Sequence, residues 1–354
     1  MFWLLCGAMT CRYLFKAWPN PVTEILNQQS HHVKWVGLAA HDLVFPTFLF
    51  LAGCSWPFSL SSQLAKGATT RQVLWKIAKR FLMLFFLGWV LFGLFTFDPS
   101  KMHIKSILGR IGFGWAVMAV VTLFFRRRWW IVALGMFGAY WLSIDLATWI
   151  CGSKPGAGVL MPCGLWNTGP INRVVDEFVL MFLPSGWQRE WFFDACGCIL
   201  SAFVGYLAGL ILRSSETSPI EKTGRLTLTA LALGAAGTIF WLAVCPCCKN
   251  EWNMTFVLVA GAIDFAVLAV LHLVVDVLRW DRWTLFFRVI GANALAMYII
   301  GHFVDFLPGV HRVFGGVEAM LPKVWTPVID ETMRFLFRWL IFYWLFLRKI
   351  FIRV

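Results

Sequence analysis

The stretch HHVKWVGLAAHDLVFPTFLFLAGCSWPFSL, residues 31–60, changes from polar to apolar halfway along its length. The first half contains three histidines and a lysine, whereas the residues after Asp42 are uncharged and mostly apolar. An apolar run of this length matches the ~30 Å hydrocarbon layer of a bilayer, so the second half predicts a membrane-spanning helix. The ionisable side chains of the first half are therefore expected at the edge of the membrane.

The composition extends this prediction to the whole chain. Hydrophobic residues make up 60% of the 354 positions and charged residues only 14%, and the mean hydropathy is +0.73. A soluble chain of this length needs more polar surface to cover its core, and a membrane β-barrel shows short segments of alternating polarity instead. We therefore expect an all-α polytopic membrane protein, a bundle of about ten transmembrane helices forming a single domain over residues 1–354. The expected spans are 1–17, 43–62, 81–98, 110–125, 129–149, 191–212, 226–246, 254–277, 284–305 and 335–352.

Basic residues indicate which loops face the cytoplasm. The short connections after the even-numbered spans are dense in Lys and Arg, as in the run Arg126–Arg128, and the odd-numbered connections carry such residues more sparsely. Positive charge in short loops is typical of the cytoplasmic side, so the net charge of +13 implies contact with membrane lipids and requires no nucleic-acid partner. The remaining connections are expected to face outward. They are residues 18–42, 99–109, 150–190, 247–253 and 306–334.

The ten cysteines form no clear framework. Cys151 and Cys163 share the longest outer loop, where a disulfide is compatible with an oxidising compartment but is not required. The CPCC cluster, Cys245–Cys248, resembles half of a zinc site, but no second ligand pair stands at the necessary spacing. We therefore expect no bound metal.

His32 and Asp42 are the candidate catalytic residues at the membrane edge. An imidazole transfers protons near neutral pH, and a carboxylate at the start of a helix either caps that helix or orients an imidazole. A solvated loop histidine is the simpler alternative for His32, and composition alone does not separate it from His31 or His41.

Polar groups inside other predicted spans indicate that a site continues into the membrane, because each such group is costly in lipid and usually lines a cavity. Arg110 begins the fourth span, Asp264 lies inside the eighth, and Asn293 lies inside the ninth. Each one, taken singly, is more often structural. Further polar residues are expected at the outer end of the bundle, namely Lys249, Asn250, Trp252, His302 and Asp305.

The quoted stretch resembles the most characteristic segment of the heparan-α-glucosaminide N-acetyltransferase family. The family pattern is His, two residues, Trp, one residue and Gly, followed by Asp-Leu-Val/Ile-Phe-Pro. The matching residues are His32, Trp35, Gly37, Asp42, Leu43, Val44, Phe45 and Pro46. Further matches follow in order at SILGRIG (106–112), KNEWNMTFVL (249–258), GANALAMYIIGH (291–302) and RKIFIRV (348–354). The resemblance covers nearly the whole chain and is to bacterial members in particular, because the lysosomal form adds a luminal domain and a further span.

This resemblance implies transfer of an acetyl group across a membrane, from cytoplasmic acetyl-CoA to the amino group of an amino sugar or glycan on the outer face. It implies that His32, with Asp42, acts either as a general base or as an acetylated nucleophile. It also implies an integral protein of a bacterial inner (plasma) membrane, and homodimerisation is left open. The expected substrate-binding residues are Trp35, Lys249, Asn250, Asn293 and His302, and the expected contacts to acetyl-CoA are Ser55 and Arg110.

The chain departs from the family pattern in two places. Relatives carry an Asp-x-x-Arg-Gly segment before the first span, whereas this sequence starts at MFWLL, so either the native start lies upstream or these contacts to the donor are missing. CPCC also replaces a Pro-rich approach to Lys249. Two other classes compete with the enzyme: a transporter or flippase whose polar residues line a substrate path, and a structural membrane protein. Against a transporter, the sequence shows no paired interrupted helices in matching halves. A purely structural role leaves the His-to-Pro segment unexplained.

Overall fold

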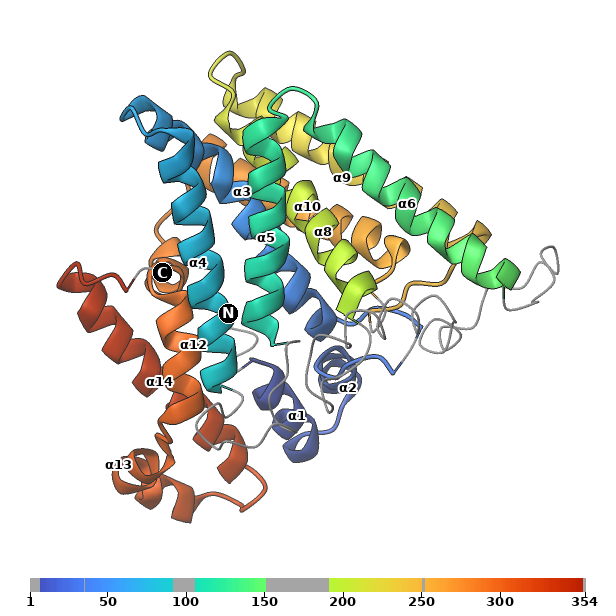
Figure 1. The fold of residues 1–354 in the computed structure, drawn as a ribbon. Coiled ribbons are helices and arrows are strands. Elements are labelled where there is room, and N and C mark those ends of the chain that lie inside the picture. The colour runs from blue at the N-terminus through green and yellow to red at the C-terminus, as the bar shows by residue number, and fades with distance from the viewer. Residues whose placement is uncertain (1–6, 35, 92–105, 151–190, 250–251, 353–354) are drawn as a thin grey trace. The chain divides into compact units, whose positions relative to one another are not determined.

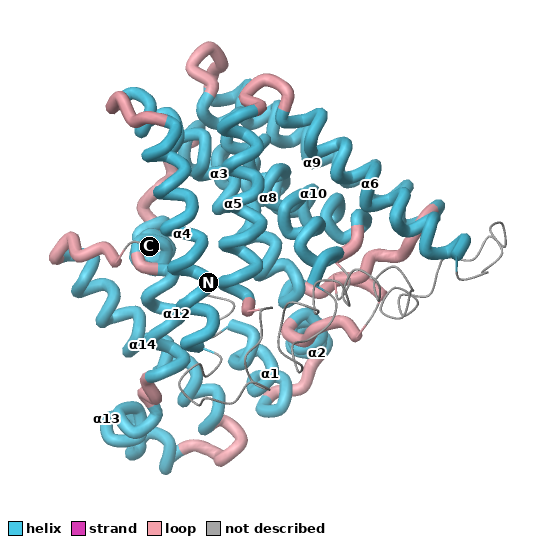
Figure 2. Tube along the Cα trace, viewed as in Figure 1, coloured by secondary structure: helices cyan, strands magenta, loops and turns pink. Residues whose placement is uncertain are grey.

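The protein is described here from a computed structural model, which covers residues 7–34, 36–91, 106–150, 191–249 and 252–352 (Figure 1). Throughout these residues every regular element is a helix (Figure 2), which confirms the predicted all-α class. The elements are α1 (Ala8–Ala17), α2 (Pro21–Gln29), the 3₁₀ turn η2 (Ala40–Leu43), α3 (Val44–Ala65), α4 (Thr70–Leu91), α5 (Ile107–Phe124), α6 (Trp129–Ile150), α8 (Trp191–Arg213), α9 (Pro219–Ala243), α10 (Met254–His272), the π-helical turn η5 (Leu273–Val277), α11 (Thr284–Ala292), α12 (Ala294–Phe303), α13 (Leu307–Met320) and α14 (Thr326–Leu347).

Five helical segments among the described residues are long and apolar enough to cross a membrane. A sixth is added if α11 and α12, which meet at a bend of 71°, form one broken span. The chain is therefore an α-helical polytopic membrane protein, but the expected count of about ten spans is not supported. The five segments are Ala40–Ala65, Ile107–Phe124, Ala195–Arg213, Pro219–Ala243 and Met254–Val277.

The other predicted spans differ from these five in identifiable ways. α1 covers residues 8–17 of the first predicted span, and residues 1–6 lie outside the described residues. α14 has the length of a span, but Arg334 and Arg338 interrupt its apolar sequence. Residues 92–98, which were expected to complete the third span, lie outside the described residues. The first and third predicted crossings therefore stay predictions.

The chain divides into two compact units. Unit 1 comprises residues 1–34, 38–44 and 280–354, and unit 2 comprises residues 35–37 and 45–279. Division by contacts does not by itself make two independently folding domains, so the single membrane domain stays a prediction.

Unit 2 has a core formed where α3, α8, α9 and α10 meet. α3 and α8 approach each other closely at Gly53, because a Cβ atom there would overlap the carbonyl oxygen of Ala202. Small residues at such a crossing let two backbones pack together, as is common between membrane helices. The core residues are Phe50, Cys54, Ala208, Leu226, Ala230, Phe265 and Ala269.

Polar caps fix where several helices of unit 2 begin. Ser106 Oγ accepts a hydrogen bond from the Gly109 amide at the start of α5 (3.0 Å). At the start of α9, the Ser218 amide donates to Glu221 Oε2 (2.8 Å) and the Glu221 amide donates back to Ser218 Oγ (3.4 Å). These contacts satisfy amide groups that the first turn of a helix leaves without a partner. The sequence therefore defines these helix starts locally.

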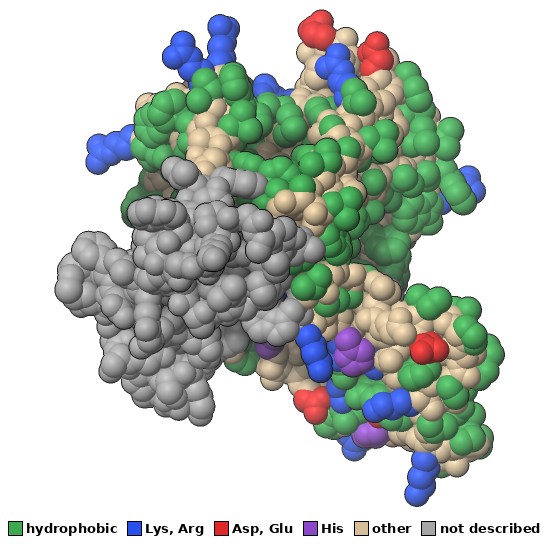
Figure 3. Space-filling view, turned by 90° about the vertical axis from the view of Figure 1, so that its right-hand side faces the viewer, with side chains coloured by type: hydrophobic (Ala, Val, Ile, Leu, Met, Phe, Trp, Pro, Cys, Tyr) green, Lys and Arg blue, Asp and Glu red, His purple; other side chains and the backbone are tan. Residues whose placement is uncertain are grey.

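The loops that follow α3, α5 and α8 lie at one end of unit 2 (Figure 1). The first two loops carry Lys66 and Arg126–Arg128, and Arg213 is the last residue of α8. In the space-filling view Lys and Arg side chains gather at this end, with some Asp or Glu side chains among them, beyond a surface of hydrophobic side chains (Figure 3). The start of α3 and the turn between α9 and α10 lie at the opposite end, because α3 runs toward the basic loops and α9 runs away from them. Unit 2 therefore has one basic end and an opposite end at which α3, the helix that follows the His32 segment in the sequence, begins.

Unit 1 has a separate core formed by α11, α12 and α14. Phe335 and Phe342 of α14 pack against the two short helices on either side of Asn293. The remaining members of this core are Val289, Ile290, Ala296 and Met297. The bend between α11 and α12 is therefore supported by apolar packing on α14.

Candidate functional site

His32 and Asp42 form a directly hydrogen-bonded pair in unit 1. His32 Nδ1 lies 2.7 Å from Asp42 Oδ1. The Asp42 side chain is 1% exposed, whereas the His32 side chain is 55% exposed. Because carboxylate oxygens accept hydrogen bonds, this contact favours the tautomer with the proton on Nδ1 and the lone pair of the neutral ring on Nε2. An imidazole oriented in this way can take a proton or act as a nucleophile.

Main-chain amides hold the other oxygen of the Asp42 carboxylate. Asp42 Oδ2 accepts hydrogen bonds from the amides of Ala39 (3.1 Å) and Val33 (3.3 Å). Asp42 lies in the η2 turn, which leads without a break into α3. The carboxylate therefore serves both roles that the sequence left open, since it organises the start of the helix and contacts the imidazole.

Helices α1 and α2 fix the chain on the other side of His32. Arg12 of α1 donates from Nε to the Ser30 hydroxyl (3.2 Å) and from Nη2 to the Ser30 carbonyl. Gln29, the last residue of α2, accepts a hydrogen bond from the Ala40 amide through Oε1 (2.8 Å). The sequence did not predict the contacts of Arg12 and Gln29, because their partners lie 18 and 11 positions away.

The neighbouring histidines have different surroundings. The ring centroids of His41 and His32 lie 4.3 Å apart at a tilt of 43°, so His41 forms part of the surface around the dyad. Desolvation lowers the pKa of His31 below its ordinary value, and the positive charges of Arg12 and His32 lower it further. The ring of His32 lies within hydrogen-bond distance of the buried Asp42 carboxylate.

The segment that follows His32 contacts the turn between α9 and α10 within unit 2. The Gly37 amide donates to the Cys247 carbonyl (2.9 Å). Gly37 has a φ of 120°, a backbone conformation that strongly favours glycine. The glycine in the His-to-Pro motif therefore has a local structural reason.

Side chains around Asn253 hold this turn in place. Asn253 caps α10 by accepting from the Phe256 amide (2.9 Å), and its Nδ2 donates to the Pro246 carbonyl (2.7 Å). Thr255 Oγ1 donates to the Cys245 carbonyl (2.8 Å). The cysteines of the CPCC cluster are buried thiols in this structure, and their carbonyls help to shape the turn. Asn253 was not singled out in the sequence, although Asn before an apolar run is a recognisable helix-cap signal.

The predicted substrate-binding residues are distributed over both units. Lys249 lies in the turn of unit 2, where its carbonyl accepts from the Trp252 amide (2.9 Å). Asn293 is buried in unit 1, and its side chain bonds to the Ile350 carbonyl (3.1 Å) and the Ile352 amide (2.7 Å). These two bonds give Asn293 a structural role, with partners near the end of the chain that the sequence did not identify.

The other predicted substrate-binding residues are less constrained by the structure. His302 is exposed near the end of α12, and its Nδ1 lies 3.1 Å from the Tyr298 carbonyl oxygen. Trp35 and Asn250 lie outside the described residues, as do Cys151 and Cys163. The binding roles of Trp35, Lys249, Asn250, Asn293 and His302 all stay predictions.

The two predicted contacts to acetyl-CoA lie in unit 2. The guanidinium of Arg110, in the first turn of α5, lies 6.0 Å from the centroid of the Phe45 ring. Ser55 is exposed on α3 and its hydroxyl donates to the Ala52 carbonyl one turn earlier (2.9 Å). Their proposed role in donor binding also stays a prediction.

The intramembrane carboxyl group noted in the sequence also has a partner on α3. Asp264 of α10 is buried and accepts a hydrogen bond from Thr47 Oγ1 (2.6 Å). This bond joins α10 to the first turns of α3. The polar group therefore contributes to helix packing inside unit 2.

Comparison with known proteins places the chain near one group of acetyltransferases. It is 26% identical to the protein named heparan-alpha-glucosaminide N-acetyltransferase from Homo sapiens, over 331 residues that cover 78% of this chain and 49% of that protein. It is 25% identical to the protein of the same name from Mus musculus, over 323 residues that cover 77% of this chain and 48% of that protein. No family model matches the chain. The matches support a family-level relationship, and the chain spans about half the length of the curated relatives it matches.

Proposed function

We propose that this family-level relative of the heparan-alpha-glucosaminide N-acetyltransferases is itself a membrane acetyltransferase. In this proposal acetyl-CoA is the donor, and the amino group of an amino sugar or glycan is the acceptor. The observation that carries the proposal is the bond between the exposed His32 ring and the buried Asp42 carboxylate. A structural membrane protein has no evident need for an imidazole oriented in this way.

In the direct route, His32 removes a proton from the acceptor amine as that amine attacks the thioester. The amine nitrogen forms a bond to the acetyl carbonyl carbon, and Nε2 takes the proton. The carbon–sulfur bond then breaks, and the coenzyme leaves as a thiol after the imidazolium returns the proton to sulfur. Asp42 stabilises the imidazolium that forms between these two steps, as a carboxylate does in other oriented dyads.

In the covalent route, Nε2 attacks the thioester carbon first, the carbon–sulfur bond breaks and the coenzyme leaves as a thiolate. The acceptor amine then attacks the acetyl carbon, the bond from Nε2 to that carbon breaks, and the proton of the amine passes to the released Nε2. The same contact between Nδ1 and Asp42 supports this route, because it leaves the ring lone pair on Nε2. The two routes differ in one observable. Labelled acetyl-CoA without an acceptor leaves an acetylated His32 in the covalent route and an unmodified His32 in the direct route.

The charge distribution of unit 2 supports opposite entry sides for donor and acceptor. Its basic end carries Lys66, Arg126–Arg128 and Arg213, which suits the phosphate groups of a coenzyme in the cytoplasm. The start of α3 lies at the other end (Figure 1), and 22 residues of α3 correspond to ~33 Å, about the thickness of the hydrocarbon layer. The donor would therefore extend its thioester along the bundle toward the end that begins α3.

One observation favours the alternative of a transporter. α11 and α12 are two short helices with a 71° bend at Asn293, and broken helices are typical of transporter substrate sites. The side chain of Asn293, however, bonds to main-chain groups of the C-terminal segment. We therefore favour the enzyme, with a local structural role for the bend.

The deciding experiment uses the purified full chain in nanodiscs with labelled acetyl-CoA and a panel of amino sugars. We expect acetylated product with at least one amino sugar, and no product from the His32→Ala variant. For each amino sugar that gives product, the same sugar with a hydroxyl group in place of the amino group is the control for amine specificity. A wild-type protein that binds an amino sugar but neither transfers nor hydrolyses acetyl-CoA would exclude the enzyme and favour the transporter.

A further inference from the structure

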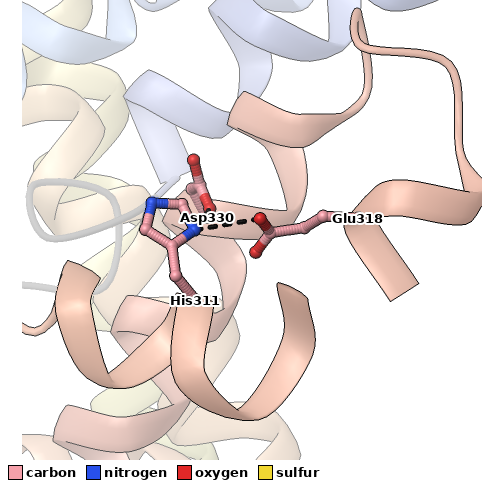
Figure 4. Close-up of side chains that lie close together, drawn as sticks. All are labelled: His311, Glu318 and Asp330. Carbon is pink, nitrogen blue, oxygen red and sulfur yellow. Dashed lines mark hydrogen bonds and ion pairs between the residues drawn. The ribbon is translucent and has the colours of Figure 1, made fainter. Parts of the chain in front are cut away.

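Three ligand-type side chains come together in the C-terminal part of unit 1, apart from the His32 dyad in the sequence (Figure 4). His311 and Glu318 both belong to α13, and Asp330 belongs to the start of α14. Seven residues separate His311 from Glu318, which is close to two helical turns, so both side chains project from the same face of α13. The packing of α13 and α14 adds Asp330 to this face.

The distances within this cluster fit a shared cation. His311 Nδ1 lies 2.9 Å from Glu318 Oε2 and 3.7 Å from Asp330 Oδ1. One ligand atom from each residue can be chosen so that all three lie within 4.8 Å of one another. Ligands ~2.1 Å from a tetrahedral zinc ion stand ~3.4 Å apart, which lies between the distances from His311 Nδ1 to the two carboxylate oxygens.

Two carboxylate oxygens of the cluster are buried without a hydrogen-bond donor among the described residues. They are Glu318 Oε1 and Asp330 Oδ1. The Glu318 side chain is 10% exposed and the Asp330 side chain is 16% exposed. A buried oxygen without a donor costs free energy, and two carboxylates held together repel each other. A cation bound between them would remove both costs.

Arg334 is a basic side chain near this cluster. It lies one turn after Asp330, donates to Glu331 Oε1 (2.9 Å) and approaches Asp305 Oδ1 at 4.0 Å, and its positive charge also acts on Asp330. Lys323 lines an open pocket of about 710 Å³ that Glu318 also lines. This pocket gives a small aqueous cation a path to the cluster, which a metal site requires.

We propose that His311, Glu318 and Asp330 bind a divalent transition-metal ion of the zinc class and thereby fasten α13 to the start of α14. One imidazole nitrogen and two carboxylate oxygens form a ligand set that zinc accepts, with a fourth position left for water. The site does not depend on the acetyltransferase proposal, because none of its residues belongs to the His32 dyad. It is assigned a structural role between two helices of unit 1.

The experiment measures zinc binding directly. The full chain in nanodiscs is stripped with a chelator, titrated with Zn²⁺ by calorimetry, and analysed for bound metal by mass spectrometry. We expect one high-affinity equivalent in the wild type and ~10- to 100-fold weaker binding in Glu318→Gln and Asp330→Asn. The matched control is Glu331→Gln, which removes the carboxylate next to Asp330 and is expected to bind zinc as the wild type does.

The buried thiols Cys245, Cys247 and Cys248 are alternative zinc ligands in the same chain. Titration of the wild type with Co²⁺ separates the two, because thiolate ligands give intense sulfur-to-metal charge-transfer absorption and oxygen or nitrogen ligands do not. We expect a spectrum without that absorption. Sulfur-to-metal bands for the high-affinity equivalent, unchanged binding in both ligand variants, or an equal loss in Glu331→Gln would each overturn the proposed site.

Discussion

Replacing Asp42 by Asn tests whether the carboxylate orients His32. Asp42 Oδ1 faces His32 Nδ1 at 2.7 Å, and Oδ2 accepts from the amides of Val33 and Ala39. An asparagine has a single acceptor oxygen, which the two main-chain amides would retain. Its NH₂ group then faces Nδ1 and requires that nitrogen to accept a hydrogen bond. The ring proton therefore moves to Nε2, the atom that must take the proton from the acceptor.

The expected magnitude follows from this change of tautomer. Loss of a general base costs ~10²–10⁴-fold in rate, and we expect Asp42→Asn to fall in this range for acetyl transfer. The folded state should be little affected, because the two main-chain bonds remain. Asp42→Ala, in contrast, leaves the buried Ala39 amide and the half-buried Val33 amide without their acceptor, at about 1–3 kcal/mol for the buried one.

The assay pairs the rate of acetyl transfer with thermal unfolding in nanodiscs for each variant. We expect Asp42→Asn to lose activity at a nearly unchanged melting temperature, and Asp42→Ala to lose both. His32→Ala should lose activity to the same degree as Asp42→Asn, whereas His31→Ala, a histidine without contact to the carboxylate, should retain most of it. An Asp42→Asn enzyme that keeps more than about a tenth of the wild-type rate would refute the orientation argument.

Three further predictions concern other parts of the chain. Gly37→Ala should lower stability by ~1–3 kcal/mol, measured by denaturant or thermal unfolding, because φ is 120° at this position; an unchanged protein would mean that the loop relaxes without cost. Ser55→Trp should weaken binding of acetyl-CoA but not of the amino sugar, which calorimetry on the same sample would measure. Normal binding of acetyl-CoA by Ser55→Trp would exclude α3 from the donor path. Gly53→Trp, in contrast, should disrupt packing because its Cβ would overlap the Ala202 carbonyl. Single cysteines at positions 34 and 127 of a cysteine-free protein should differ on intact cells, with position 34 labelled by an impermeant thiol reagent, and the opposite result would invert the topology.

The helical class and much of the His32 segment could be predicted from the sequence because both depend on local properties. Apolar runs of about 20 residues identify membrane helices whatever their neighbours are, and five such helices are found among the described residues. His32 and Asp42 are ten residues apart, and a short loop before a helix leaves few ways to arrange them. The predicted count of about ten crossings is not supported, because five helices among the described residues meet the length and composition of a span.

Contacts between distant residues were decided only by the tertiary structure. Asn293 looked like a polar group in a membrane span, but its bonds go to Ile350 and Ile352 at the end of the chain. The sequence identifies no partner for Gly53, but α8 packs directly against it.

The sequence by itself thus determined that this is a helical membrane protein with an imidazole and a carboxylate at the start of one span. The tertiary structure decided which polar side chains meet. His311 and Asp330 stand 19 positions apart on two different helices, and nothing in the sequence paired them. The physical reason is that hydrophobic length and helix caps act within a few turns of one chain segment, whereas a hydrogen bond between helices depends on how all the apolar faces pack.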